Sequence, residues 1–396
     1  MDRYTADKII NCLECGIVPM DCVKYFSAGR EKEIGLIQKL LSETESGNSG
    51  LLFVHGHYGI GKTHILGLTL DCALERGFIA SHVTLTSREC PLSHLNDVYR
   101  NILKNLCFSG QQHKSGFYSF LESWLNLTAQ KILSHKDERC KHNLTYQTCG
   151  FGCLDELYGK YIPELWKVGE DFRSAVKLYQ YAELRGNMQV KDYIIRWLLG
   201  EKIKRVDLNW INKQLGSVKI QNNIGDDNAF MMLKNISQVS KIMGFNGFVI
   251  LLDEAESIPS IHRVTDGYIN LIKLIIQSIN MSGVFFVYAT TPQFYDDARI
   301  YLKSFESEET KDLLDLVYKR MEDEKLKLIP LTSDELEFIA NKIFEIYMVS
   351  VGDECNSHLT LRWQQMKDEI TEICGARQTM RDFIGRIVMN IKRIEN

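Results

Sequence analysis

The pattern of apolar and polar positions predicts short buried strands alternating with amphipathic helices. Three apolar runs, at residues 51–55, 247–253 and 283–291, suit strands buried on both faces, and a shorter one lies near 325–329. Between them, apolar residues recur every three or four positions, as on one face of a helix. The chain is therefore predicted to be an α/β protein with a parallel sheet.

A glycine-rich stretch joins the first strand to a predicted helix. It reads GHYGIGKT from Gly56 to Thr63 and satisfies the phosphate-loop pattern G-x-x-x-x-G-K-T in full. The next residues have helical spacing from Ile65 to Ala73 and end at Gly77. A chance match in a turn is the alternative, but strand, loop and helix together place the loop at a helix N-terminus, where anions bind. We predict that the loop binds a nucleotide.

Each residue type in this loop has a chemical role that suits nucleotide binding. Glycine permits positive φ angles that turn backbone N–H groups toward the β-phosphate. Lys62 is expected to neutralise β- and γ-phosphate charge, and the Thr63 hydroxyl to ligate Mg²⁺. The residues expected around the nucleotide are Gly56, His57, Tyr58, Gly59, Ile60, Gly61, Lys62, Thr63 and His64.

Two later strands end in polar residues that suit hydrolysis. The second apolar run ends in Asp253 and Glu254. Asp253 is expected to hold Mg²⁺ through a water, and Glu254 to polarise the attacking water as general base. The third run ends in Thr290 and Thr291, of which Thr291 is expected to help position that water. Solvated acids at a strand end are the alternative, but next to a phosphate loop the pair predicts an ATPase.

The segment between the phosphate loop and Asp253 is far longer than one strand and two helices require. The excess, at about 108–226, has helical spacing and repeated aromatic residues, which suit either added hydrophobic core or a stacking platform beside Lys202, Lys204 and Arg205. We expect this insertion to recognise a partner. The aromatic residues are Tyr118, Phe120, Trp124, Tyr179, Tyr181, Tyr193 and Trp197.

The chain is expected to divide into three parts. Residues 1–48 are predicted to form an N-terminal helical segment, 49–330 the ATPase core with its insertion, and 331–396 a helical lid. The lid is expected to begin at an N-cap, Thr332 or Ser333, with acidic residues in its first turn.

Composition mainly excludes classes of protein. No apolar run reaches the ~18 residues of a membrane span, and the first residues lack a signal-peptide pattern, so we expect a cytoplasmic protein. A net charge of −4 over 396 residues gives no general attraction to nucleic acid, so any DNA contact is expected to be local or indirect.

The cysteines suggest at most one metal site. Eleven cysteines, an odd number, do not suit a disulfide framework in a reducing compartment. Cys140, His142, Cys149 and Cys153 could bind Zn²⁺ tetrahedrally, although their irregular spacing equally suits unliganded thiols.

Together these motifs resemble the AAA+ ATPases, in particular the branch of origin-recognition proteins. The stretch at 28–41 looks like that branch's Gly-Arg-Glu box, which lies near the adenine pocket and implies a nucleotide contact for Arg30. The resemblance implies that Arg320, ahead of Pro330, is an arginine finger acting between subunits of an oligomer, and that Arg377 is the sensor-2 residue of the lid. Each arginine could equally be a solvated helix residue.

A narrower resemblance covers nearly the whole chain. Segments such as VPMDCVKYFSAGREKEI, RGFIASHVTLTS and AELRGNMQVKDYIIRWLLGEKI look like the BREX ATP-binding family of bacterial anti-phage systems. The resemblance implies an ATPase that uses ATP and Mg²⁺ to drive or gate assembly with a defence-system partner, most simply a helicase.

Two other functions are alternatives. A DNA-loading ATPase of the replication or transposition type is one, but such loaders usually carry a winged-helix domain after the lid, and this chain ends at Asn396, just after the sensor-2 helix. A nucleotide-gated scaffold is the other, and the Glu254 carboxylate argues against a purely structural role.

Overall fold

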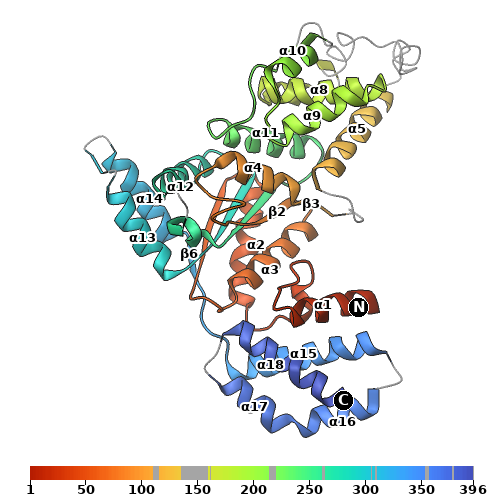
Figure 1. Cartoon of the computed structure of the whole chain (residues 1–396), viewed down its shortest axis with the longest axis vertical. Helices are drawn as coiled ribbons and strands as arrows, with labels where there is room; N and C mark the ends of the chain where they lie inside the picture. Colours follow the sequence, from red (N-terminus) through yellow and green to blue (C-terminus); the bar gives the residue numbers. More distant parts are fainter. Residues whose placement is uncertain are drawn as a thin grey trace.

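The described part of the chain is built around one six-stranded sheet (Figure 1). In this computed structural model the strand order is β3-β2-β4-β5-β1-β6, and every neighbouring pair is parallel except β2 and β3. The predicted α/β class and mostly parallel sheet are confirmed. The strands span Gly50–His55 (β1), Ile79–Thr84 (β2), Leu106–Cys107 (β3), Phe248–Asp253 (β4), Val284–Thr290 (β5) and Lys325–Lys327 (β6). The structure describes residues 1–109, 116–134, 159–160, 162–213, 220–260, 264–304, 306–307, 310–352, 356–376 and 379–395.

Helices cover both faces of the sheet. On β1, Leu51 and Phe53 contribute to one hydrophobic core and Leu52 and Val54 to another, because side chains alternate along a strand. Helices α2 and α3 pack on the Leu52 face, and α4 and α12 on the opposite one. This double burial explains the continuous apolar runs in the sequence. These helices and their neighbours span Glu31–Glu45 (α2), Lys62–Glu75 (α3), Leu95–Lys104 (α4), Ala255–Ser260 (η3), Val264–Ser278 (α12), Pro292–Lys303 (α13) and Lys311–Asp323 (α14).

The C-terminal helices form a group at one end of the molecule (Figure 1). Thr332, one of the two expected positions, is the N-cap of α15, and its side chain and that of Glu335 form a capping box. The N-terminal helix α1 packs against α15 and α18 although the whole core separates them in sequence. The elements of this end span Arg3–Glu14 (α1), Val23–Phe26 (η1), Ser333–Val351 (α15), Asn356–Gln365 (α16), Lys367–Gly375 (α17) and Met380–Glu395 (α18).

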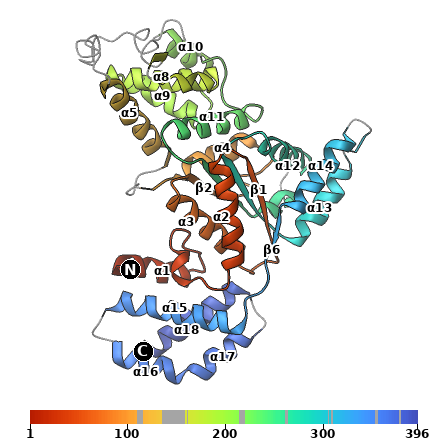
Figure 2. The same cartoon turned by 180° about the vertical axis from the view of Figure 1, so that it is seen from behind.

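The helices of residues 116–213 lie at the opposite end of the molecule (Figures 1 and 2). Two of their tryptophans continue the hydrophobic core of one sheet face: Trp124 and Trp197 are fully buried, and Trp197 Nε1 donates a hydrogen bond to the Asn222 carbonyl oxygen at 2.9 Å. The idea that these tryptophans form a stacking platform is therefore wrong, because a buried ring cannot reach a partner. These helices and the neighbouring α11 span Gly116–Ser134 (α5), Pro163–Lys167 (η2), Glu170–Leu184 (α8), Met188–Leu198 (α9), Arg205–Lys213 (α10) and Ala229–Ile242 (α11).

Some of the predicted features of this end are exposed, and others lie outside the described residues. Tyr118 is exposed, as are Lys202, Lys204 and Arg205. The four candidate zinc ligands between residues 140 and 153 lie outside the described residues.

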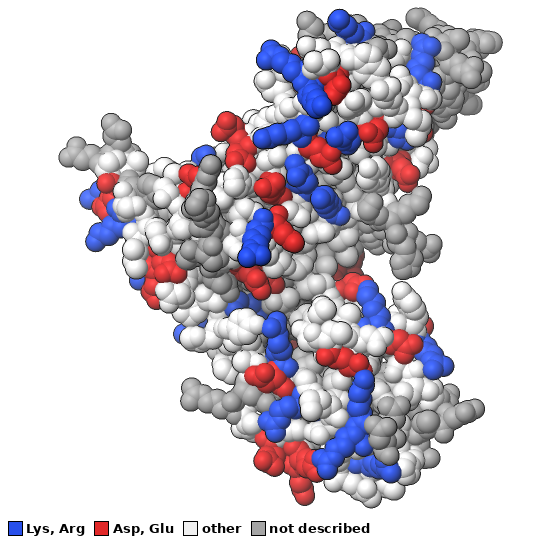
Figure 3. All heavy atoms as spheres, viewed as in Figure 1, with Lys and Arg blue, Asp and Glu red and all other residues white. Residues whose placement is uncertain are grey.

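Charges of both signs are mixed on the surface seen in Figure 3. Lys and Arg side chains there are interspersed with Asp and Glu over the core and over both ends of the molecule, so the described residues form no extended basic patch on that face. None of the helices within the described ranges is long and apolar enough to cross a membrane.

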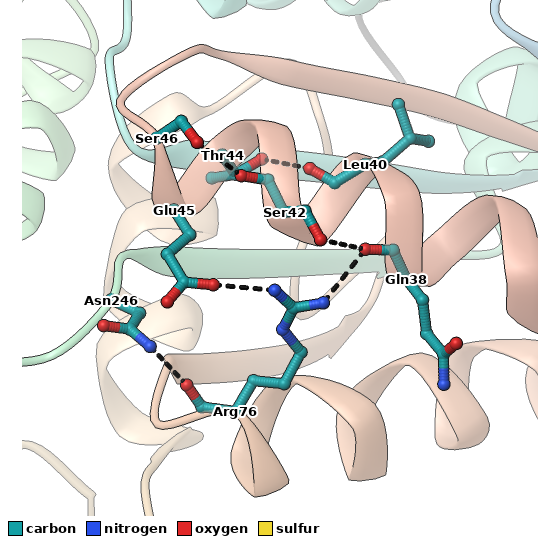
Figure 4. A network of polar contacts seen from close by, with 8 residues as sticks. All are labelled: Gln38, Leu40, Ser42, Thr44, Glu45, Ser46, Arg76 and Asn246. Carbon is teal, nitrogen blue, oxygen red and sulfur yellow. Dashed lines mark hydrogen bonds and ion pairs between the residues drawn. The ribbon is translucent and has the colours of Figure 1, made fainter.

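A polar network holds the C-terminal ends of α2 and α3 together (Figure 4). The Arg76 guanidinium donates to the Gln38 carbonyl oxygen at 3.1 Å and to Glu45 Oε2 at 2.7 Å. Asn246 Nδ2 in turn donates to the Arg76 carbonyl oxygen at 2.6 Å. Because Asn246 precedes β4, the network joins both helices to the amino end of the sheet, opposite the phosphate loop.

One buried carboxyl makes the stability of the fold depend on pH. Asp71 Oδ2, in α3, is buried without a hydrogen-bond partner among the described residues. Burial raises the pKa of Asp71 to about 6, with Lys24 opposing and Glu75 reinforcing the shift. A carboxyl whose pKa is raised in the folded state stabilises the fold at low pH and loses that contribution as pH rises through about 6.

Replacing Asp71 with asparagine should therefore flatten the pH dependence of stability. Between pH ~4.5 and ~8, wild type should lose about 2 kcal/mol more unfolding free energy than Asp71→Asn. Urea unfolding at both pH values measures this difference. The exposed Asp7, replaced in the same way, is the control and should leave the wild-type dependence unchanged; equal pH profiles for Asp71→Asn and wild type would contradict the assignment.

Candidate nucleotide-binding site

The glycine-rich stretch forms a loop between the carboxyl end of β1 and the start of α3. Gly59 and Gly61 have φ angles of 76° and 104°, a region that favours glycine. Gly61 is the N-cap residue of α3 and offers no side chain to its first N–H groups. The N-terminus of α3 therefore lies at the loop, and its free N–H groups can donate hydrogen bonds to a bound anion.

The Lys62 side chain crosses this loop. Its Nζ donates to the carbonyl oxygens of Gly56 at 3.1 Å and His57 at 3.3 Å, and the side chain is buried. The Gly56 N–H in turn donates to the Thr290 carbonyl oxygen at 3.1 Å, which joins the loop to the end of β5. The structure thus holds the Lys62 charge within the loop predicted to bind phosphate.

Thr63 and Asp253, 190 positions apart, meet beside the loop. The Thr63 hydroxyl donates to Asp253 Oδ2 at 2.8 Å. Burial alone would raise the pKa of Asp253, but interactions with the His82 ring and the Thr63 hydroxyl outweigh burial and keep it below its usual value. An ionised carboxylate and a hydroxyl at this distance provide the oxygen ligands that Mg²⁺ prefers, so the residues fit the predicted cation.

Glu254 has an unusual backbone. Among the described residues it is the one non-glycine residue with positive φ, at 56°. Its N–H donates to Asp253 Oδ1 at 2.9 Å, and its side chain is exposed at the edge of the pocket. A strained conformation directly after a buried strand points to function, because it turns the carboxylate out of the sheet toward the pocket.

His82 is a site residue that the sequence analysis missed. Its Nε2 is buried, has no hydrogen-bond partner within the described residues, and lies 3.7 Å from Asp253 Oδ2. His82 belongs to β2, which pairs with β4 in the sheet. A histidine in an apolar strand gives no local signal of this contact, because the contact depends on which strands become neighbours.

A pocket of about 890 Å³, including its opening to solvent, lies between the loop, α1 and α18. Polar groups from Lys62, Thr63, Asp253 and Glu254 line one part, and apolar side chains line the rest. That division suits a nucleotide, whose phosphates need charge and whose base needs apolar walls. The apolar lining residues, which the sequence analysis also missed, are Leu13, Ile17, Val18, Phe26, Met380 and Ile384.

The start of α18 touches the phosphate loop directly. The Met380 N–H donates to the Gly59 carbonyl oxygen at 2.7 Å, and Arg381 Nη1 donates to the Tyr58 hydroxyl at 2.5 Å. A Cβ atom on Gly59 would lie 2.4 Å from Thr379 Cβ, so this approach also requires glycine. Arg381 lines the pocket, whereas Arg377, the expected sensor-2 residue, lies outside the described residues.

Arg30 lies behind the loop rather than in the pocket. Its buried guanidinium donates to the carbonyl oxygens of Ile60 at 3.3 Å and Ile329 at 3.0 Å, and to Glu33 Oε1 at 3.1 Å. Arg30 is not among the residues that line the pocket, and its guanidinium contacts the loop through the Ile60 carbonyl oxygen. Its expected contact with the nucleotide stays a prediction.

His64 and Thr291 also make contacts within the protein. His64 Nε2 lies 2.6 Å from Ser27 Oγ, and burial followed by the charge of Arg30 lowers the pKa of His64 to about 4. His64 is therefore neutral near pH 7. Thr291 is the N-cap of α13 and accepts from the Phe294 N–H at 3.4 Å, which fixes its hydroxyl at the carboxyl end of β5.

Arg320 is not at the phosphate loop of its own chain. It lies in the last turn of α14, and its Nη2 is 3.6 Å from Glu324 Oε1. The chain then enters β6, which runs parallel to β1 toward the loop. Arg320 is thus near the opposite end of these strands.

The comparisons with known proteins concern the chain as a whole. A comparison with curated proteins found no match. A model of the family described as BREX system ATP-binding protein BrxC/D matches residues 1–396, the full length of the sequence. That match agrees with the phosphate loop and pocket and implies an ATP-binding protein of phage defence. The chain belongs to the BREX system ATP-binding protein BrxC/D family.

Proposed function

We propose that this protein is an AAA+-type ATPase that binds and hydrolyses ATP with Mg²⁺ to drive or gate a phage-defence assembly. The observation that carries the proposal is the 2.8 Å contact between the Thr63 hydroxyl and Asp253 Oδ2. It joins the phosphate loop to a buried, ionised carboxylate, and a site that only held a phosphate would not need that carboxylate there.

The residues of the site divide the work of hydrolysis. Lys62 and the loop N–H groups bind the β- and γ-phosphates, while Thr63 and Asp253 hold Mg²⁺. A Mg²⁺ ion held by these two residues would supply positive charge to offset the charge that develops on the phosphates. Glu254 accepts a proton from the attacking water. The water oxygen bonds to the γ-phosphorus as the bond between the γ-phosphorus and the β–γ bridging oxygen breaks. Thr291, between the loop and Asp253, orients that water.

The helical lid supports the AAA+ assignment. Through Met380 and Arg381, α18 contacts the loop and closes one side of the pocket, so lid position and nucleotide binding are physically linked. We propose that the lid supplies positive charge to the phosphates. Arg377, just before α18, is the residue that the resemblance assigns to this task, and Arg381 is the arginine that lines the pocket.

We further propose that the partner is a protein of the same defence system, such as a helicase. The whole-chain family match supports a defence ATPase over a DNA loader. The insertion at about 108–226 is the proposed recognition element, with exposed Lys202, Lys204 and Arg205 in place of the buried tryptophans.

An experiment with mixed subunits tests both the hydrolysis and the oligomer. Wild type should release phosphate from ATP only with Mg²⁺. Arg320→Ala should reduce turnover by ~10³-fold, because an arginine supplied by a neighbour stabilises transition-state charge. Mixing it with Lys62→Ala should restore turnover, since a site can then combine an intact loop with an intact Arg320.

Arg299→Ala is the matched control, because Arg299 is an exposed arginine on the neighbouring α13 that pairs with Glu322. It should retain wild-type turnover. A lack of Mg²⁺-dependent phosphate release by wild type, with or without the other proteins of its defence system, would refute the ATPase. Wild-type turnover by a protein that stays monomeric would refute only the role of Arg320.

A further inference from the structure

We infer that Gly29 and Arg30 couple the phosphate loop to the helical lid, so that a nucleotide in the loop changes how the lid is held. This inference rests on the proposed binding of ATP at the loop. It assigns to the Gly-Arg-Glu box a mechanical task rather than a contact with the nucleotide.

The Arg30 guanidinium joins three segments that are distant in sequence. Nη2 donates to the carbonyl oxygen of Ile60, in the phosphate loop, at 3.3 Å. Nη1 donates at 3.0 Å to the carbonyl oxygen of Ile329, in the connection between β6 and α15. Glu33 balances the charge at 3.1 Å, and the Arg30 side chain is only 4% exposed. Inside the protein such charge-assisted bonds are strong, and losing an acceptor is costly.

The contact with Ile60 places Arg30 next to the phosphate-binding groups. The peptide group whose C=O accepts from Arg30 has the Gly61 N–H on its other side. In a phosphate loop the N–H groups turn toward the anion. Gly61 has φ of 104° and carries no side chain that would oppose rotation. When this peptide turns to meet a phosphate, the acceptor of Arg30 moves with it.

Gly29 makes the matching contact with the lid itself. Its φ is 67°, and a Cβ atom there would lie 2.1 Å from Glu335 Oε1. Glu335 closes the capping box of α15 by accepting from the Thr332 N–H at 2.7 Å. The Glu335 side chain therefore lies directly on the Gly29 backbone, and a larger residue there would displace that side chain from the capping box.

Together these contacts give the lid two attachments to the loop. One is direct, through the contacts of Met380 and Arg381 in α18 with the loop, and the other passes from Ile60 through Arg30 to Ile329. The second attachment reaches the connection that leads from β6 into α15, the first helix of the lid. A change in the loop is thereby transmitted to the base of the lid as well as to α18.

Hydrogen exchange with and without a non-hydrolysable ATP analogue tests the coupling. In wild type, the analogue should change the exchange of residues 329–340 and 379–388. Arg30→Lys keeps the charge beside Glu33, but one ammonium cannot reproduce the spread of guanidinium donors. We expect this variant to bind the analogue while its nucleotide-dependent change at 329–340 falls about tenfold, as for a lost charge-assisted bond.

Arg76→Lys is the matched control, since Arg76 also bridges a helix carbonyl and a carboxylate, far from the loop (Figure 4). It should keep the full response. Gly29→Ala should alter exchange at 329–340 even without nucleotide, because the added Cβ displaces Glu335. Thermal unfolding of each variant establishes that it is folded.

The outcomes separate this inference from the proposed function. A full response in Arg30→Lys, or a wild type that binds the analogue without any change at 329–340, would overturn the coupling and leave ATP binding intact. Loss of analogue binding by folded Arg30→Lys would show that Arg30 acts on the nucleotide itself, which also overturns the inference. A folded wild type that does not bind the analogue would refute ATP binding and the coupling together.

Discussion

Lys62→Ala should lose ATP binding, with an affinity weakened by about 100-fold or more, as expected when a buried charge-assisted contact is removed. The wild-type ammonium lies within the loop, bonded to the Gly56 and His57 carbonyl oxygens, so the substitution removes both the phosphate partner and a brace of the loop. Because these contacts form in the ground state, binding itself should fail. Titration with a fluorescent ATP analogue measures the effect.

Lys62→Arg is the matched control for this result. It keeps the charge while changing its shape, so it should bind more tightly than Lys62→Ala if charge dominates the contact. Thermal unfolding without nucleotide should show both variants folded. Near wild-type affinity in Lys62→Ala would mean that the nucleotide binds elsewhere.

Glu254→Gln, unlike Lys62→Ala, should bind ATP as wild type does. Its turnover should be lower by ~10²–10⁴-fold, the usual contribution of a general base. Glutamine keeps the size of the side chain and the backbone N–H that donates to Asp253, but it cannot accept the water proton. Phosphate release and analogue titration on the same sample distinguish the two effects.

Glu31→Gln, an exposed acid at the start of α2, is the control for Glu254→Gln and should retain turnover. Hydrolysis by Glu254→Gln at the wild-type rate, with the defence-system proteins present, would remove Glu254 from the mechanism. Another acceptor would then have to take the proton.

The phosphate end of the site could be predicted because its signals are local. Strand, glycine loop, lysine and helix follow one another within about 25 residues, so backbone geometry alone places Lys62 and Thr63 at a helix N-terminus. Asp253 and Glu254 needed one further step: parallel strands bring their carboxyl ends to the same edge of a sheet. The structure brings Thr63 and Asp253 together as that step implied.

The rest of the site depends on packing between distant segments. His82 approaches Asp253 only because β2 becomes the neighbour of β4, and Arg381 reaches Tyr58 only because α18 packs on the loop. The apolar part of the pocket combines α1 with α18, from opposite ends of the chain. No window of sequence contains both members of any of these pairs.

Arg30 shows that a motif in the sequence does not reveal which contacts its side chain makes. The Gly-Arg-Glu box lies near the pocket, yet Ile60 and Ile329 take up the donors of its arginine. Trp197 shows the same limit for a pattern. Helical spacing of aromatic residues suits a buried core and an exposed platform equally, and the fold buries that ring completely.

What the sequence by itself determined was the α/β class, the position of the glycine-rich loop, the two carboxylates at a strand end and a helix start at Thr332 or Ser333, because propensity, capping and short motifs act over a few residues. The tertiary structure alone decided which helices close the pocket, which arginine faces it and which aromatic residues are buried. Those outcomes depend on how helix and sheet faces from distant parts of the chain pack together. The sequence pattern of one element indicates which of its faces is apolar but not which element packs against that face.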